Sequence, residues 1–198
     1  MNAPLGKSQW QEAHDFWFVE LRPKQWFVSS AQLDRTITER FASTLESLAN
    51  NSHIPPVTTA SLAACHIHTA QDTLAAILVT DQFSRNIHRG SAAAFATDAL
   101  ALALSEHLVA TDVLQDFTPA EAQFALMPFM HAETMQSQDI SVNLFTQFDI
   151  EQALPSAIEH RELIRRFGRF PHRNELLGRE STAQEKDYLK TGKTFGQG

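Results

Sequence analysis

Cysteine, glycine and proline are scarce in this chain, and each shortage excludes a class of protein. The single cysteine among 198 residues, Cys65, excludes an intrachain disulfide and favours a reducing compartment, so we expect a cytoplasmic protein. Seven glycines and eight prolines, without any low-complexity segment, argue against disordered and fibrous proteins. The N-terminus lacks the basic start and apolar stretch of a secretory signal.

Long apolar runs are missing as well. The most apolar windows, residues 74–79 and 92–104, are too short or are interrupted by Asp98, and a membrane-spanning helix needs about 20 residues. We therefore expect no membrane partner. A chain of this length with 43% apolar residues can bury one substantial core, so we expect a single domain over residues 1–198.

Alternating runs of β-branched residues are absent, whereas apolar residues recur at helical spacing. Leu33, Ile37, Phe41, Leu45 and Leu48 lie on one helical stripe. We expect an all-α fold, a compact bundle or superhelix of about eight antiparallel-stacked helices. The expected helices cover residues 8–21, 30–49, 58–85, 91–108, 118–134, 138–148, 155–167 and 182–190.

Several helix boundaries have local signals. Capping boxes begin at Thr118 and Thr182, and Gly168 is positioned to end a helix. Pro128 lies inside an expected helix and should kink it or end it near Met127, because proline lacks a backbone donor.

Positive charge is absent from residues 90–159, which contain ten carboxylates but no lysine or arginine. Six of the sixteen Lys and Arg residues instead fall within residues 160–179, in a chain of net charge −7. The net acidity argues against nucleic acid as a partner. The cluster requires a specific counter-ion, which is either the protein's own carboxylates or an anionic ligand.

A first group of polar residues, 81–90, ends an apolar helix. Asp81 and Arg85 are four residues apart and can pair on one face, as can Gln82 and Asn86. The end of the group, Arg89-Gly90, is typical of a helix C-terminus. Ser84 is poorly supported as a nucleophile because no G-x-S-x-G motif surrounds it.

A second group, residues 127–133, contains His131 and Glu133. Their spacing of two places them on different sides of a helix, and no histidine belongs to an HExxH or related metal motif. No glycine-rich phosphate loop occurs either. We therefore expect neither a metal nor a cofactor.

The third group, residues 160–179, is open to two interpretations. Its arginines either tie the C-terminal segment to Asp81, Glu133 and other carboxylates, or line an anion pocket, since arginine is suited to bidentate contact with carboxylate or phosphate. The pocket would contain Arg85, Arg169, His172 and Arg173.

These three groups also resemble a known family. DQFSRNIHRG, MPFMHAE and RFGRFPHRNELLGRESTAQE look like the motifs, in the same order, of the bacterial domain-of-unknown-function family 924. The resemblance extends from Phe16-Trp17 to Phe195, and it implies a compact all-α, tetratricopeptide-like fold without an established activity. This chain departs from the family pattern at Ser84, where proline is usual, and at Ala132, where serine is usual.

Three functional hypotheses follow. The first is a helical domain that binds a small anionic ligand or peptide, with ligand-binding candidates Arg85, Asn86, His131, Glu133, His160, Arg166, Arg169, His172, Arg173, Asn174 and Arg179. The second is a hydrolase-type enzyme that uses His131 or His172 as acid or base, with Glu133 or Asp81 orienting it. The third is an interaction scaffold, or a homo-oligomer, in which Trp10, Trp17 or Trp26 contacts another chain.

Overall fold

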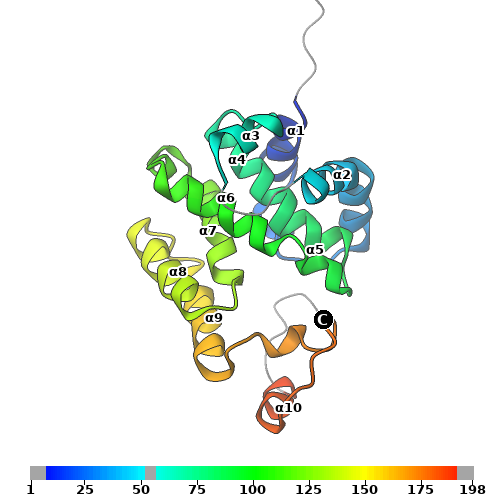
Figure 1. The fold of residues 1–198 in the computed structure, drawn as a ribbon, viewed down its shortest axis with the longest axis vertical. Coiled ribbons are helices and arrows are strands. Elements are labelled where there is room, and N and C mark those ends of the chain that lie inside the picture. The colour runs from blue at the N-terminus through cyan, green and yellow to red at the C-terminus, as the bar shows by residue number, and fades with distance from the viewer. Residues whose placement is uncertain (1–7, 52–56, 191–198) are drawn as a thin grey trace, which may run out of the picture.

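Helices and turns make up the computed structural model, which describes residues 8–51 and 57–190; no strand occurs within these ranges (Figure 1). The all-α prediction is therefore confirmed. The α-helices are α1 (Gln9–Asp15), α2 (Ala31–Asn51), α3 (Thr59–Ala64), α4 (Ala70–Ile77), α5 (Ser84–Ile87), α6 (Asp98–Ala110), α7 (Pro119–His131), α8 (Met135–Gln147), α9 (Leu154–Phe167) and α10 (Ala183–Leu189). Two π-helices, η1 (Phe16–Glu20) and η3 (Leu78–Phe83), and the 3-10 helices η2 (Pro23–Gln25), η4 (Ala92–Phe95), η5 (Leu114–Asp116) and η6 (Pro171–Arg173) complete the elements.

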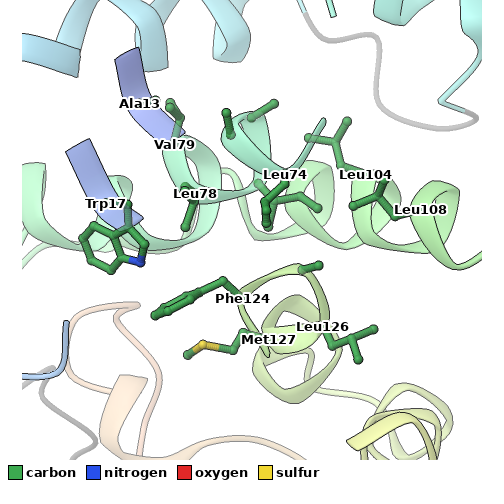
Figure 2. Packing of buried hydrophobic residues seen from close by; sticks show 14 of the residues in the cluster. Ala13, Trp17, Leu74, Leu78, Val79, Leu104, Leu108, Phe124, Leu126 and Met127 are labelled. Carbon is green, nitrogen blue, oxygen red and sulfur yellow. The ribbon is translucent and has the colours of Figure 1, made fainter. Parts of the chain in front are cut away.

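The core surrounds α4 and η3, in which every residue from Thr73 to Phe83 is buried. Side chains from α1 and η1, α6 and α7 point into the same interior, as Figure 2 shows for Trp17, Leu78, Leu104 and Phe124. A smaller cluster, formed by Leu163, Ile164 and Phe170, lies where the C-terminal segment packs on α9. Burial on every side explains why residues 74–79 read as a continuous apolar run.

Most predicted helix starts are confirmed. The side chains of Ser8, Thr118 and Thr182 accept hydrogen bonds from backbone N–H groups of the first helical turn. Gly168 ends α9 in the left-handed conformation, at φ 69°. Phe195, where the family resemblance ends, lies outside the described residues.

The single helix predicted over residues 58–85 is wrong. The chain leaves the helix after Ala64, and His66 adopts φ 56°. Thr69 then starts α4, because its side chain accepts from the N–H of Asp72 while the Asp72 carboxylate accepts from the N–H of Thr69. Cys65 is consequently the half-buried C-cap of α3, packed against the core rather than inside a long helix.

Pro128 does not end its helix at Met127, because α7 continues to His131. Beyond this point the side chain of Gln138, in α8, donates to the backbone oxygens of Met130 and Ala132, each at 2.8 Å. These bonds satisfy carbonyl groups that a helix end leaves open, and they hold α8 against the end of α7.

One stretch of the described chain, Ala92–Ala110, is long and apolar enough to cross a membrane by length and composition alone. It is divided into η4 and α6, and Leu100, Leu104 and Leu108 belong to the core. Asp98, at the start of α6, forms an ion pair with Arg85. These contacts are those of a core helix.

The tryptophans of the interaction-scaffold hypothesis lie mostly inside. Trp10 and Trp17 are buried, so neither is an exposed contact for another chain. Trp26 is half-buried and donates from its ring nitrogen to the backbone oxygen of Trp17 at 2.9 Å. The version of the scaffold hypothesis that relies on Trp10 and Trp17 is therefore wrong.

Candidate functional site

A cavity of about 520 Å³ lies where α5, α7 and α9 face the loop before α2 and the C-terminal segment. This volume falls within the range of roughly 300–1,000 Å³ that is typical of small-molecule sites. Each helix contributes residues at helical spacing, and two loops complete the wall. The lining residues are Trp26, Phe27, Val28, Ser29, Gln82, Arg85, Asn86, Arg89, Gln123, Met127, Met130, His131, Gln152, Ala153, Ser156, His160, His172 and Arg173.

Asp81 lies behind this lining, fully buried in the π-helix η3. One of its oxygens lies 2.7 Å from Nδ1 of His131 and 3.3 Å from Nη1 of Arg85, and the other accepts from Gln82 at 2.6 Å. Burial alone would raise the pKa of Asp81, but His131 and Arg85 lower it below its usual range. The predicted pairing of Asp81 with Arg85 is therefore present. Single-turn π-helices are rare in proteins, but those that occur often lie at functional sites.

The contact with Asp81 also orients His131. An ionised carboxylate only accepts hydrogen bonds, so Nδ1 of His131 carries the proton and Nε2 is the ring nitrogen left for the cavity. The predicted alternative, in which Glu133 orients His131, is not what the structure contains. Glu133 instead accepts from Arg179 at 2.6 and 3.0 Å and from the N–H of Phe170 at 2.8 Å.

Arg173 is a buried cation of the cavity wall, at 6% exposed, like Arg85 at 7%. Its guanidinium carbon lies over the rings of Phe95 and Phe170, 4.6 and 4.7 Å from their centroids. It makes one hydrogen bond among the described residues, from Nη1 to Asp98 at 3.1 Å, and its Nε is buried without a partner there. Burial lowers the pKa of Arg173 to about 10, although Asp98 opposes the change.

The other two arginines of the wall are also held from behind. Arg85 lies 3.0 Å from one oxygen of Asp98 and donates to the other at 3.1 Å. Arg89 donates to both oxygens of Asp34, at 2.7 and 2.9 Å, and Asn86 donates to the same carboxylate. The predicted pairing of Gln82 with Asn86 is replaced by these bonds.

Three histidines lie close together at this end of the cavity. The ring centroids of His131 and His160 are 6.2 Å apart, and Phe170 lies 5.3 Å from His160 and 5.6 Å from His172. Burial, with a contribution from His131, lowers the pKa of His160 to about 3. Burial and Arg173 lower the pKa of His172 to about 4. Both rings are therefore neutral at pH 7.

The charges of the site are arranged in two layers. Among the described residues the cavity is lined by three arginines and three histidines but by no carboxylate. The carboxylates of Asp34, Asp81 and Asp98 face the arginines from behind. The two interpretations of the arginines are thus compatible, because the same side chains form internal ion pairs and line a cavity.

Some predicted site residues meet here and others do not. Arg85, Asn86, His131, His160, His172 and Arg173 line the cavity, and Asp81 supports it. Five others lie elsewhere: Glu133 and Arg179 pair with each other, Arg169 pairs with Glu185 at 2.7 Å, Asn174 donates to Ser181, and Arg166 is exposed over the ring of Phe167. Ser84 is buried with its hydroxyl bonded to the Thr80 backbone oxygen, so it does not reach the cavity.

Sequence reasoning missed the remaining residues of the wall, apolar ones among them. Met127 and Gln123 precede His131 by four and eight residues, so helical spacing carries a signal for them. The loop residues 26–29 have no such pattern, because a loop reaches the cavity only through tertiary packing. Within the described part of the chain, no group of three or more His, Cys, Asp or Glu residues is arranged to hold a metal ion.

A family model and a solved structure both relate this chain to bacterial proteins of unknown function. The family model described as "Bacterial protein of unknown function (DUF924)" matches residues 13–193. A solved structure, "Structure of Protein of Unknown Function ATU0120 from Agrobacterium tumefaciens", is 32% identical, with a TM-score of 0.79 over 92% of this chain and 97% of that one. No curated protein matches the chain.

Proposed function

Since this chain belongs to the DUF924 family of bacterial proteins, whose description names no activity, we propose from its cavity that it binds a small anionic molecule or a peptide carboxylate. The observation that carries the proposal is Arg173. A buried arginine normally satisfies its donors, because each donor left without a partner costs desolvation free energy. Arg173 makes one hydrogen bond to the protein and borders the cavity. An anionic ligand in the cavity would supply acceptors to the remaining Nη donors of Arg173.

The surroundings support the same reading. His131 and His172 add donors or acceptors beside Arg173, and Asn86 contributes an amide. Hydrogen bonds to charged groups contribute about 1.5–3 kcal/mol each, so three of them at the upper end of this range approach the roughly 8 kcal/mol of micromolar binding. We include in the proposal a single domain, because the wall is built from segments as distant as residues 26 and 173, and a cytoplasmic location, which the single cysteine favours. The tetratricopeptide-like arrangement remains what the family resemblance implies.

Thermal-shift titration with acetate and inorganic phosphate tests the proposal. A ligand at 100 times its dissociation constant adds about 2.7 kcal/mol of stability. We expect Arg173→Lys to abolish the shift, because lysine keeps the charge opposite Asp98 but loses the planar donor edge. Arg166→Gln is the matched control, since Arg166 is exposed outside the cavity. A shift that survives Arg173→Lys, or no shift with any anion, would refute binding at this site.

A second candidate function is hydrolysis, which the 2.7 Å contact of His131 with Asp81 favours. Nε2 of His131 would take a proton from water, and the hydroxide would attack the carbonyl carbon of an ester. As the C–O bond breaks, the same nitrogen returns the proton to the departing oxygen, giving an acid and an alcohol. Arg173 and Arg85 would stabilise the negative charge that develops on the carbonyl oxygen.

Turnover of 4-nitrophenyl acetate separates this candidate from simple binding. We expect His131→Gln to lose the activity but to keep part of the anion-induced thermal shift, because Arg173 remains. Asp139→Asn is the control, because Asp139 is an exposed partner of Arg161 outside the cavity. Equal rates for the wild type, His131→Gln and buffer would eliminate catalysis on this ester class and leave the binding function intact.

A further inference from the structure

We infer that the ligand is a monocarboxylate with an apolar body, held with its carboxylate at Arg173 and its body against the aromatic loop before α2. This inference rests on the proposed function and names the ligand class of that same cavity. It follows from the difference between the two ends of the cavity and from the charge balance of its wall.

The cationic end is formed by Arg173, Arg85 and the three clustered histidines. The guanidinium of Arg173 lies over the rings of Phe95 and Phe170, and these contacts restrict its orientation. A planar carboxylate matches the outer donor edge of a guanidinium.

The other end is apolar. Trp26 packs edge-on against Phe124, with centroids 5.1 Å apart, and Phe27 stacks on the same ring at 5.9 Å and 11°. Phe27 is nevertheless 60% exposed, which is unusual for a stacked phenylalanine and leaves one of its faces uncovered. Burial of an apolar ligand body against this face would remove it from water.

Two methionines belong to the cavity wall between the cationic residues and the aromatic loop. Met127 and Met130 line the cavity from α7. In the sequence of this helix they lie between Phe124, which contacts the aromatic loop, and His131, which belongs to the cationic end. Methionine side chains are flexible and polarisable, so they accommodate apolar groups of varied shape. The cavity wall therefore carries apolar side chains between the aromatic loop and the cationic end.

Charge balance favours one negative charge over two. The wall contributes Arg85, Arg89 and Arg173, and these are already opposed by Asp34, Asp81 and Asp98. A monoanion adds one uncompensated charge, which hydrogen bonds from the arginines and one histidine can offset. A phosphate dianion adds two in a partly desolvated site, at a correspondingly larger electrostatic cost.

Calorimetric titration with straight-chain carboxylates from acetate to decanoate tests the inference. We expect the affinity to rise about fourfold per added methylene, which corresponds to ~0.8 kcal/mol, until the cavity is filled. Octanol and octylamine, which have the same apolar body without the negative charge, should bind at least tenfold more weakly than octanoate. Tighter binding of octylamine than of octanoate would overturn the assignment of the cationic end.

A matched pair of variants locates the apolar body. Phe27→Ser should flatten the dependence on chain length and leave acetate binding unchanged, and Val19→Ser, at an even more exposed apolar residue outside the cavity, should change neither. If anions bind through Arg173 but chain length has no effect, the inference fails and the proposed function stands. If no anion binds, or binding ignores Arg173→Lys, the proposed function itself fails.

Discussion

Nδ1 of His131 lies 2.7 Å from Oδ1 of Asp81, although fifty residues separate the two in the sequence. The contact joins the last residue of α7 to the middle of η3 and lies directly behind the cavity wall. Asp81 also faces Arg85, so one buried carboxylate fixes the positions of two residues that line the cavity.

Asp81→Asn should therefore destabilise the protein strongly. The substitution preserves size but leaves Arg85 with less compensation, and breaking a buried ion pair costs about 3–5 kcal/mol. We expect about 3 kcal/mol, because Asp98 still faces Arg85. Urea denaturation measures the change. Asp139→Asn, which removes a partner from an exposed pair with Arg161, serves as the control and should stay within about 0.5 kcal/mol. Equal losses in both variants would contradict the role of Asp81.

Stability should decline as the pH falls from 7 to 5. In the folded protein burial lowers the pKa of His160 from 6.5 to about 3, so the unfolded chain takes up the proton first. The contribution of neutral His160 to the free energy of unfolding is fully present above about pH 6.5. It is lost progressively toward pH 3, and the slope approaches ~1.4 kcal/mol per pH unit. Denaturant unfolding at pH 7, 6 and 5 measures the combined slope, to which His172 contributes in the same direction because its pKa is lowered to about 4.

His160→Phe is the variant that isolates the effect. Phenylalanine fills the same space against Phe170 without a titratable group, so the slope between pH 7 and 5 should become shallower. His107→Phe, on α6 and outside the cavity wall, should retain the wild-type slope. Wild-type protein that is as stable at pH 5 as at pH 7 would show that His160 is charged in the folded state.

Thr69→Ala should weaken the start of α4. The Thr69 hydroxyl accepts from the N–H of Asp72 at 3.0 Å, and loss of such a cap costs about 1 kcal/mol. Thr69→Ser keeps the acceptor and should cost less than half as much. Thermal unfolding compares Thr69→Ala with Thr69→Ser. Equal melting temperatures would show that the Thr69 cap is not the reason why α4 starts at this position.

Features encoded within a few residues were predictable from the sequence. The capping boxes at Thr118 and Thr182, the glycine that ends α9 and the pairing of Asp81 with Arg85 depend only on neighbours within one helical turn. The break before α4 was also local, because Thr69 and Asp72 form a capping box. It was missed because the apolar residues on both sides suggested one continuous helix.

The cavity depends instead on contacts across the whole chain. Asp98 meets Arg173 over 75 residues, and Asp34 meets Arg89 over 55. No local sequence pattern predicts which carboxylate pairs with which arginine, or on which side of the arginine the carboxylate lies. The sequence could therefore identify Arg85 and Arg173 as important cations, but only the tertiary arrangement distinguishes the carboxylates behind the wall from the open cavity in front of it.

Anion binding should be accompanied by proton uptake. In the free protein burial and the adjacent Arg173 lower the pKa of His172 to about 4, and Glu133, His131 and Arg85 are the other charged or titratable groups that act on it. A bound carboxylate adds one negative charge to a wall whose arginines are already opposed by aspartates, so it should raise the pKa of His172 toward neutrality.

The affinity for octanoate should consequently increase as the pH is lowered from 8 to 6, by at most tenfold per pH unit, the limit for one proton per ligand. Calorimetry in two cationic buffers with different heats of ionisation counts the protons directly. His172→Gln should bind octanoate without proton uptake, whereas His107→Gln should behave as the wild type. Octanoate binding that releases protons, or uptake that persists in His172→Gln, would show that another group responds to the ligand charge. In either case the neutral state of His172 would not be what limits anion affinity at pH 7.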